Sequence, residues 1–465
     1  MRYKLIILVI FTIIIFRGCD SAENRFLCDD PPLVLTADSL KDALGAFSVK
    51  DLPDVVPDCK RVLKANATPL TQKMWNIALH DVEQNLVTND YGTYFAAGRR
   101  YTERVYTRDI AFAGILGLNA IYPQEMKRSL EITREVRTAL GYKVSAPHVV
   151  KEIDAPWEVI FETEPEVMNK YRTNSITRRT DDVVWIWAVE DLFKQHPEVA
   201  DWKWLYETGE KYFEEIYAPW FDESDGLYRC QPAFQDIEST AYPDSLDIAD
   251  CVLMKGASTN CLYYKALLSM SEAAKESGQP VEISDSWAKR AENLKSAILD
   301  ELILPDGTLT YYKDRYGNVM LNQHNLGTAF AVIFGVLEGE DAVRAIRDYP
   351  MTDRGIPLIY PFLTDNQGPH NQASWPFCST FFLWAKEVAE GRDFTDYNAA
   401  LMARSLGTKL AENRNKNWGG FGSFHEKIQL PSGIIDGSGQ QLWSSAAFMN
   451  VCLRAGLVED KELIQ

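Results

Sequence analysis

The sequence lacks an excess of basic residues, and this absence excludes one class of partner. Its 465 residues contain 48 Lys and Arg against 66 Asp and Glu, which gives a net charge of −18. Nucleic-acid binding depends on a basic face that neutralises phosphates. We therefore expect no nucleic-acid partner, and an uncharged substrate suits so acidic a protein.

Cysteines are few, and they are not spaced as metal ligands. The eight Cys residues form no CxxC pair and no Cys/His pattern typical of zinc, so we expect no metal and no cofactor. The GxSxG, P-loop and HExxH motifs are also absent. A Cys28–Cys59 disulfide is compatible with the sequence, but nothing in the pattern requires it.

Only one long apolar run is present, and it lies at the N-terminus. Leu5–Phe16 is too short for a comfortable membrane span and suits the core of a signal peptide. Gly18-Cys19 follows and resembles a bacterial lipobox, so residues 1–19 are predicted to be a signal peptide of lipoprotein type. We expect export to the periplasm or cell surface, with membrane contact only through a lipid at Cys19 or a signal anchor. Because Arg17 is atypical of a lipobox, ordinary secretion is an alternative.

The spacing of apolar residues predicts an all-α protein. Residues 20–70 are expected to form an extended lead-in, and residues 71–465 one catalytic domain in which apolar residues recur every three to four positions. Ser258 and Ser374 are predicted N-caps. Helical pairs joined by long polar loops favour an (α/α)6 toroid of six hairpins, with the loops on one face forming the site; a helical-repeat binding protein is the alternative. The predicted helices are 71–87, 110–121, 123–140, 181–195, 201–217, 258–276, 285–302, 326–338, 374–390, 394–412 and 440–455.

A stretch with five carboxylates precedes the helix predicted at 258. These acids lie among aromatic and small residues. Acids packed this closely repel one another, and burial would raise the pKa of at least one, so that it could donate a proton at neutral pH. A solvated acidic loop is the alternative. The five are Asp236, Glu238, Asp244, Asp247 and Asp250.

Four further segments concentrate polar and aromatic side chains at helix ends. Arg108 and Asp109 can grip neighbouring hydroxyl groups, one by donating and one by accepting hydrogen bonds; a charge pair at a helix end is the alternative. Asp181 suits an N-cap, which leaves Asp182 as the better candidate ligand. The other candidates are His370 and Trp375 in HNQASWPF, Trp418 and Glu426 in WGGFGSFHE, and Trp443 in QLWS.

Together these segments resemble the six-hairpin glycosidases, (α/α)6-barrel glycoside hydrolases that include glucoamylase-like, trehalase-like and glucosidase-I-like enzymes. The resemblance runs from Tyr106 to Leu457 and depends on three blocks in this order: FQDIESTAYPD…KGASTNCLYY, HNQASWPF and E…DGSGQQLWSSAAF. It implies an inverting hydrolase with its acid in the mid-chain loop, at Asp236, and its base in the late loop, at Glu426. Where members of the family have Trp after the acid, this chain has Ile237.

The resemblance also implies a mechanism and a substrate. Asp236 would protonate the leaving oxygen and Glu426 would activate water, with their carboxyl groups roughly 6.5–9.5 Å apart. We expect exo action on an oligosaccharide or glycan, with Glu238 or Asp244 as reserve donors. The remaining predicted contacts to the carbohydrate are Arg108, Asp109, Asp182, Glu238, Asp244, His370, Trp375, Trp418 and Trp443.

Two other functions stay open at this point. A surface glycan-binding lipoprotein would use the same aromatic side chains without turnover. A lyase or epimerase on the same toroid would use a His, Tyr or Arg base, for which His324, His370 and His425 are candidates.

Overall fold

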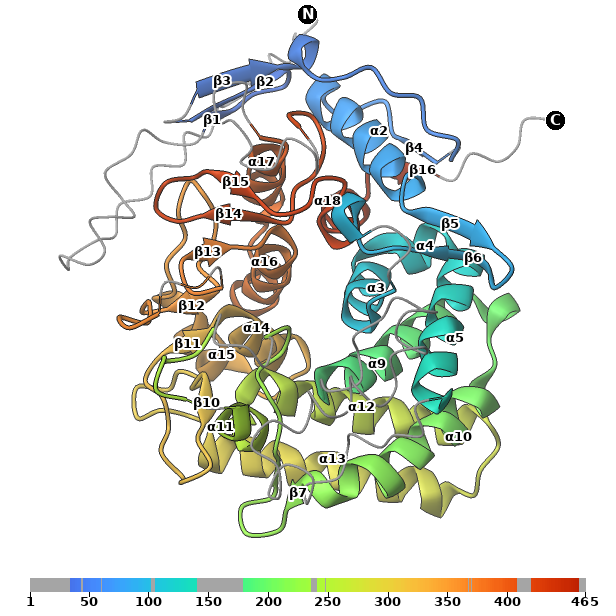
Figure 1. The fold of residues 1–465 in the computed structure, drawn as a ribbon, viewed down its shortest axis with the longest axis vertical. Helices are drawn as coiled ribbons and strands as arrows, with labels where there is room; N and C mark the ends of the chain where they lie inside the picture. The colour runs from blue at the N-terminus through green and yellow to red at the C-terminus, as the bar shows by residue number, and fades with distance from the viewer. Residues whose placement is uncertain are drawn as a thin grey trace, which may run out of the picture.

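Six helices form a closed inner ring in the computed structural model (Figure 1). It describes residues 34–42, 45–59, 61–101, 105–139, 179–235, 241–246, 248–366, 368, 370–407 and 420–459. Each inner helix packs against the next, and the last packs against the first, which closes the ring. The inner helices are α3 (Thr107–Ala113), α9 (Arg179–Gln195), α12 (Ala257–Glu276), α14 (Asn325–Ile333), α16 (Pro376–Glu390) and α18 (Leu442–Arg454).

Six outer helices cover this ring within the described ranges (Figure 1). The predicted (α/α)6 toroid is therefore confirmed. Of the twelve helices of the toroid, the sequence missed α15, because the apolar pattern was extended through Gly335, where a backbone φ of +73° ends α14. The short helix α11 (Ile248–Leu253), in the loop before α12, was also missed. The outer helices are α2 (Pro69–Glu83), α5 (Pro123–Ala139), α10 (Trp202–Lys211), α13 (Val281–Glu301), α15 (Gly339–Arg347) and α17 (Thr395–Ser405).

The burial patterns explain which helices lie inside. All residues of α3 are buried, and so is α18 from Leu442 to Cys452. A helix that is buried all round belongs inside a domain, whereas a helix with one apolar stripe covers it. The outer helix α13 has such a stripe, with Trp287, Ala291 and Leu294 buried at three- and four-residue spacing.

Short strands border the inner helices at their beginnings. Strand β9 (Lys255–Gly256) leads into α12, β11 (Gln323–His324) into α14, and β13 (Ala373–Ser374) comes just before α16. Both predicted N-caps were therefore wrong. The N-cap of α12 is Gly256, and the Ser258 hydroxyl instead accepts a hydrogen bond from the Ala233 N–H. The N-cap of α16 is Trp375, because Ser374 lies in strand β13. The partners are β10 (Tyr312–Lys313) for β9, β12 (Ile359–Tyr360) for β11, and β14 (Lys427–Gln429) for β13, with β15 (Ile435–Asp436) beside β14.

The lead-in is not entirely extended. Its described part forms a small three-stranded sheet and a strand, β4, that pairs with β16 near the other end of the chain. The remaining strands are β1 (Val34–Leu35), β2 (Ser39–Asp42), β3 (Gly45–Ser48), β4 (Val62–Leu63), β5 (Leu86–Asn89), β6 (Gly92–Phe95), β7 (Phe221–Asp222), β8 (Leu227–Tyr228) and β16 (Val458–Glu459).

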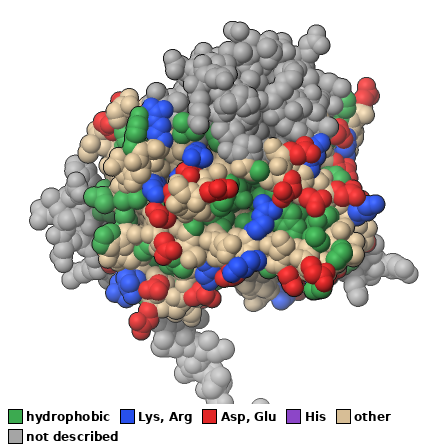
Figure 2. Space-filling view, turned by 90° about the horizontal axis from the view of Figure 1, so that it is seen from below, with side chains coloured by type: hydrophobic (Ala, Val, Ile, Leu, Met, Phe, Trp, Pro, Cys, Tyr) green, Lys and Arg blue, Asp and Glu red, His purple; other side chains and the backbone are tan. Residues whose placement is uncertain are grey.

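The outer wall carries charges of both signs. In the view from below, acidic and basic side chains alternate with apolar ones over this edge of the ring (Figure 2). No helix in the described ranges is long and apolar enough to cross a membrane. Residues 1–33 lie outside the described residues, so the signal peptide, the lipid at Cys19 and the Cys28–Cys59 bridge stay predictions.

Candidate active site

The N-terminal ends of the inner helices meet at one end of the ring. Side chains from one helix start contact those of another, and these contacts bring together candidates that are hundreds of residues apart in the sequence. They run from α3 to α9, from α9 to α12, from α16 to α18, and from α18 back to α3. The contacts are Arg108 Nε to Asp181 Oδ1 (3.0 Å), Thr180 Oγ1 to Thr259 Oγ1 (3.0 Å), Trp375 to Trp443 (5.9 Å between ring centroids) and Gln441 Nε2 to Asp109 Oδ1 (3.3 Å).

Glu426 is a buried carboxylate at this end. It directly precedes β14, and its two oxygens are held separately: the Tyr101 hydroxyl donates to Oε1 (2.8 Å) and the Ser438 N–H donates to Oε2 (2.8 Å). Burial raises the pKa of Glu426 above its ordinary value, although both hydrogen bonds act in the opposite direction by stabilising the carboxylate. Such a group is suited to accepting a proton from a bound molecule.

A glycine makes room for Glu426. Gly437 has φ +82°, and a Cβ there would lie 2.3 Å from Glu426 Oε2, so any side chain would displace the carboxylate. The segment carrying Tyr101 runs beside this turn, where the Arg100 N–H donates to Ser438 Oγ (3.1 Å). Two segments more than 300 residues apart thus build the surroundings of one acid.

Phe234 lies at the centre of an aromatic cluster. Its ring is 4.6 Å from Trp375 and 5.5 Å from Trp443, and 5.0 Å from His370. Phe234 has φ +70°, which is unusual for a residue with a side chain and costs about 1–3 kcal/mol. Trp375 and Trp443 are both 3% exposed, and their indole N–H groups have no hydrogen-bond partner among the described residues. Strain and unsatisfied donors of this kind are typical of ligand sites.

The two aspartates at the start of α9 have different partners. Asp182 is completely buried, and Arg134 of α5 donates to it (2.7 Å) and to the Tyr212 hydroxyl (2.7 Å). Asp181 is the ion-pair partner of Arg108. Asp182 therefore fastens α9 to α5, and this geometry does not favour its predicted role as a sugar ligand; Asp181, expected as a simple N-cap, is the one beside Arg108.

Part of the predicted site lies outside the described residues, namely Asp236, Glu238 and Trp418. Phe234 and Gln235, which directly precede Asp236, are buried in the aromatic cluster and against His324. Asp244 is described and is exposed, which does not suit the reserve proton donor that the sequence predicted.

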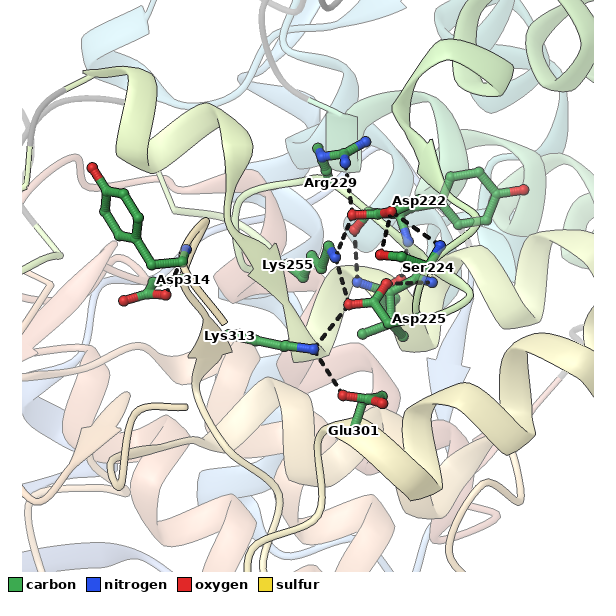
Figure 3. A network of polar contacts seen from close by, with 12 residues as sticks. Asp222, Ser224, Asp225, Arg229, Lys255, Glu301, Lys313 and Asp314 are labelled. Atoms are coloured by element: carbon green, nitrogen blue, oxygen red, sulfur yellow. Dashed lines mark hydrogen bonds and ion pairs between the residues drawn. The ribbon is translucent and has the colours of Figure 1, made fainter. Parts of the chain in front are cut away.

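The two stems of the loop that carries Asp236 are fastened together. The Cys230 N–H donates to the Met254 carbonyl (2.7 Å), and the Gly256 N–H donates to the Cys230 carbonyl (2.9 Å). Beside them, Lys255 Nζ bridges Asp222 (2.7 Å) and Asp225 (2.5 Å), as Figure 3 shows. Lys313 extends this ion network from Asp225 to Glu301, and Arg229 pairs with Asp222 (Figure 3).

Sequence reasoning missed several residues of this site. Tyr101 stands alone in a GRRY segment outside any predicted helix, and nothing local marks it. Gln235 was missed as well. His324 was named only as a candidate base of a lyase or epimerase, and only the fold brings it to Gln235 (Nε2 to Nε2, 3.0 Å). No group of His, Cys, Asp and Glu in the described ranges is arranged to hold a metal ion.

Three solved structures with a similar fold are glycosidases. The chain is similar to the GH78 family rhamnosidase of Bacillus sp. GL1 (TM-score 0.54, 14% identity, 90% of this chain and 37% of that one). It is also similar to a rhamnosidase from Klebsiella oxytoca with rhamnose bound (TM-score 0.53, 13% identity, 90% of this chain and 68% of that one). A glycosidase in complex with glucose is similar as well (TM-score 0.53, 12% identity, 83% of this chain and 98% of that one). Its fold is the (α/α)6 barrel of these glycosidases.

These similarities are in structure alone. No protein-family model matches the sequence, and no curated protein does. The chain spans little more than a third of the Bacillus rhamnosidase. At 12–14% identity they establish the fold and leave the activity to be argued from the site.

Proposed function

We propose that this chain is an inverting glycoside hydrolase with Glu426 as general base and Asp236 as general acid. The observation that carries the proposal is Glu426 itself, a buried carboxylate with two fixed hydrogen-bond donors, at the helix ends where the aromatic cluster lies. The (α/α)6 barrel shared with solved glycosidases supports the same reading.

The proposed reaction uses one proton at each carboxyl group. Asp236 gives its proton to the glycosidic oxygen as the bond from the anomeric carbon to that oxygen breaks. A water oxygen bonds to the anomeric carbon from the opposite face, and Glu426 takes a proton from that water. Inversion follows because attack and departure occur on opposite faces, and exchange with solvent restores both groups.

We further propose exo action on an uncharged glycan. Trp375 and Trp443 are nearly completely buried, which suits a sugar at a chain end better than one in the middle of a long polymer. Arg108 and Asp109 would bind hydroxyl groups of that terminal sugar. We also propose that the protein is exported and attached to the membrane by a lipid at Cys19.

Activity assays on two variants test this function. Wild type should release sugar from aryl glycosides or natural disaccharides, with the inverted anomer seen first by NMR. Glu426→Gln and Asp236→Asn should each lower kcat by about 10²–10⁴-fold, while Asp285→Asn, an exposed acid on α13, should not. A product of retained configuration would contradict inversion. Unchanged sugar binding with no turnover in any form of the protein would favour a glycan-binding function.

A lyase or epimerase is the second candidate that the sequence left open. His324 is a poor base for such a reaction, because burial, and then the neighbouring His370, lower the pKa of His324 to about 3, and its Nε2 already contacts Gln235 Nε2 (3.0 Å). A lyase would form a new double bond with ultraviolet absorbance, and an epimerase would change a sugar without releasing one. Either product, with full activity retained in Glu426→Gln, would replace the hydrolase proposal.

A further inference from the structure

Three buried polar side chains have unused hydrogen-bonding capacity: Gln235 follows Phe234 of the aromatic cluster and contacts His324 (3.0 Å), and Asn325 follows His324 in the chain. Gln235 and His324 are each 1% exposed, and Asn325, the first residue of α14, is 0% exposed. Among the described residues, Gln235 Oε1, His324 Nδ1 and both amide atoms of Asn325 have no hydrogen-bond partner. Buried polar groups are normally satisfied, and each one left unpaired costs about 1–3 kcal/mol.

The contact between Gln235 and His324 shows which of their hydrogen-bonding atoms stay without a partner. Gln235 Nε2 can only donate, so His324 Nε2 accepts and the hydrogen is on Nδ1. One donor atom (His324 Nδ1) and one acceptor atom (Gln235 Oε1) therefore remain without any partner among the described residues. The reverse orientation of the Gln235 amide would exchange these two roles and still leave one donor and one acceptor. Asn325 adds another of each.

These three side chains are uncharged, and Lys427, whose Nζ lies 5.5 Å from the centroid of the Trp375 ring, already pairs with Asp436 (3.6 Å). His324 stacks on Tyr311 at 5.3 Å and is too deeply buried to be protonated near neutral pH. Arg108 is paired with Asp181, and Arg134 with Asp182. A ligand carboxylate here would be a buried charge without a partner, whereas a hydroxyl group both donates and accepts.

We propose that Gln235, His324 and Asn325 bind hydroxyl groups of an uncharged sugar ring, beside Phe234 and its indole neighbours, and thereby exclude uronic acids. The proposal rests on the proposed function only in taking the ligand to be a carbohydrate. It assigns to this chain a specificity for neutral hexoses or deoxyhexoses.

The test uses the full-length protein and two variants on different elements, Gln235→Met and Asn325→Ala. Binding of glucose, rhamnose and glucuronate is measured by isothermal titration calorimetry, and the melting temperature is measured without ligand. At least one neutral sugar should bind about ten-fold or more tightly than glucuronate. Each variant should weaken that binding about ten-fold, and Gln279→Met, at a half-buried position after α12, should not.

Melting separates binding from a structural role. Because both amide atoms of Asn325 are unpaired among the described residues, Asn325→Ala should leave the melting temperature unchanged or raise it, whereas Gln235→Met also removes the hydrogen bond to His324 and should lower it slightly. Lower melting temperatures with unchanged sugar binding would overturn the proposal, and so would tight binding of glucuronate or no binding of any sugar. If the sugars bind as expected but are not hydrolysed, the hydrolase proposal is wrong and this inference stands. If the protein hydrolyses a glycoside and neither variant changes that activity, this inference is wrong and the hydrolase proposal stands.

Discussion

Tyr101 and Glu426 form a pair whose protonation should set the working pH. Burial raises the pKa of the Tyr101 hydroxyl, and next the charge of Glu426 does so, so the hydroxyl stays protonated and donates to the carboxylate. That hydrogen bond stabilises the ionised form of Glu426. A base must be ionised to act, so activity should fall as the pH falls through the raised pKa of Glu426.

Replacement of Tyr101 by Phe should move this acid limb to higher pH. Without the hydroxyl, the carboxylate loses about 1–1.5 kcal/mol of stabilisation, so the pKa of Glu426 rises by roughly one unit. We expect the lower limb of the kcat/KM profile to shift upward by that amount, with activity recovered at higher pH. A Tyr94→Phe control, away from Glu426, should keep the wild-type profile. A uniform loss of activity without a shifted limb would contradict this role.

The sequence could supply Glu426 but not its surroundings. Glu426 lies in a glycine- and aromatic-rich segment that carries an evident chemical pattern, and Arg108-Asp109 does the same at the start of α3. Tyr101 lies more than 300 residues from Glu426, and its role depends on a contact that no local pattern encodes. Asp182 was predicted to bind substrate from its local sequence, but its buried partner is Arg134 on another helix, and local sequence does not reveal that contact.

At the scale of elements, a network of ion pairs holds together the two ends of the loop between β8 and α12. Lys255 is the central cation, with its side chain 8% exposed between Asp222 and Asp225. Burial opposes ionisation of Asp222, but hydrogen bonds from Lys255 and Ser224 prevail and lower its pKa. Because the folded value is depressed, this stabilisation is present above the unfolded pKa of about 3.9 and is lost as the pH falls further.

Replacing Lys255 by Met should therefore destabilise the protein at neutral pH. Two nearly buried carboxylates would lose their shared cation, and we expect the free energy of unfolding to fall by about 2–3 kcal/mol, less than for a fully abandoned charge because Arg229 and Lys313 remain. Urea unfolding at pH 7 measures this, and the difference from wild type should narrow near pH 3. Lys203→Met, at an exposed pair on α10, should cost less than about 0.5 kcal/mol. Equal effects of the two substitutions would contradict the argument.

At the scale of the whole molecule, helical periodicity predicted the hairpins, and closure of the ring follows from contacts between the two ends of the chain. Gly117, in the π turn η3 (Gly114–Leu118) that continues α3, packs directly against α18. A Cβ at Gly117 would lie 2.9 Å from Met449 Cβ. This seam joins the first inner helix to the last, and no sequence spacing reveals which glycine lies in it.

A valine at Gly117 should weaken the entire ring. The added methyl groups must push α18 away from α3, and overpacking of this kind costs about 1–3 kcal/mol. In a closed ring every inner helix has two inner neighbours, so opening one seam should lower the stability of all of them together. We expect far-ultraviolet circular dichroism and tryptophan fluorescence to report the same downward shift in urea midpoint. Gly420→Val, where no atom of the described residues lies within 4 Å of the added Cβ, should leave the midpoint within error. Two separated transitions in Gly117→Val would mean that the hairpins unfold independently and that closure does not couple them.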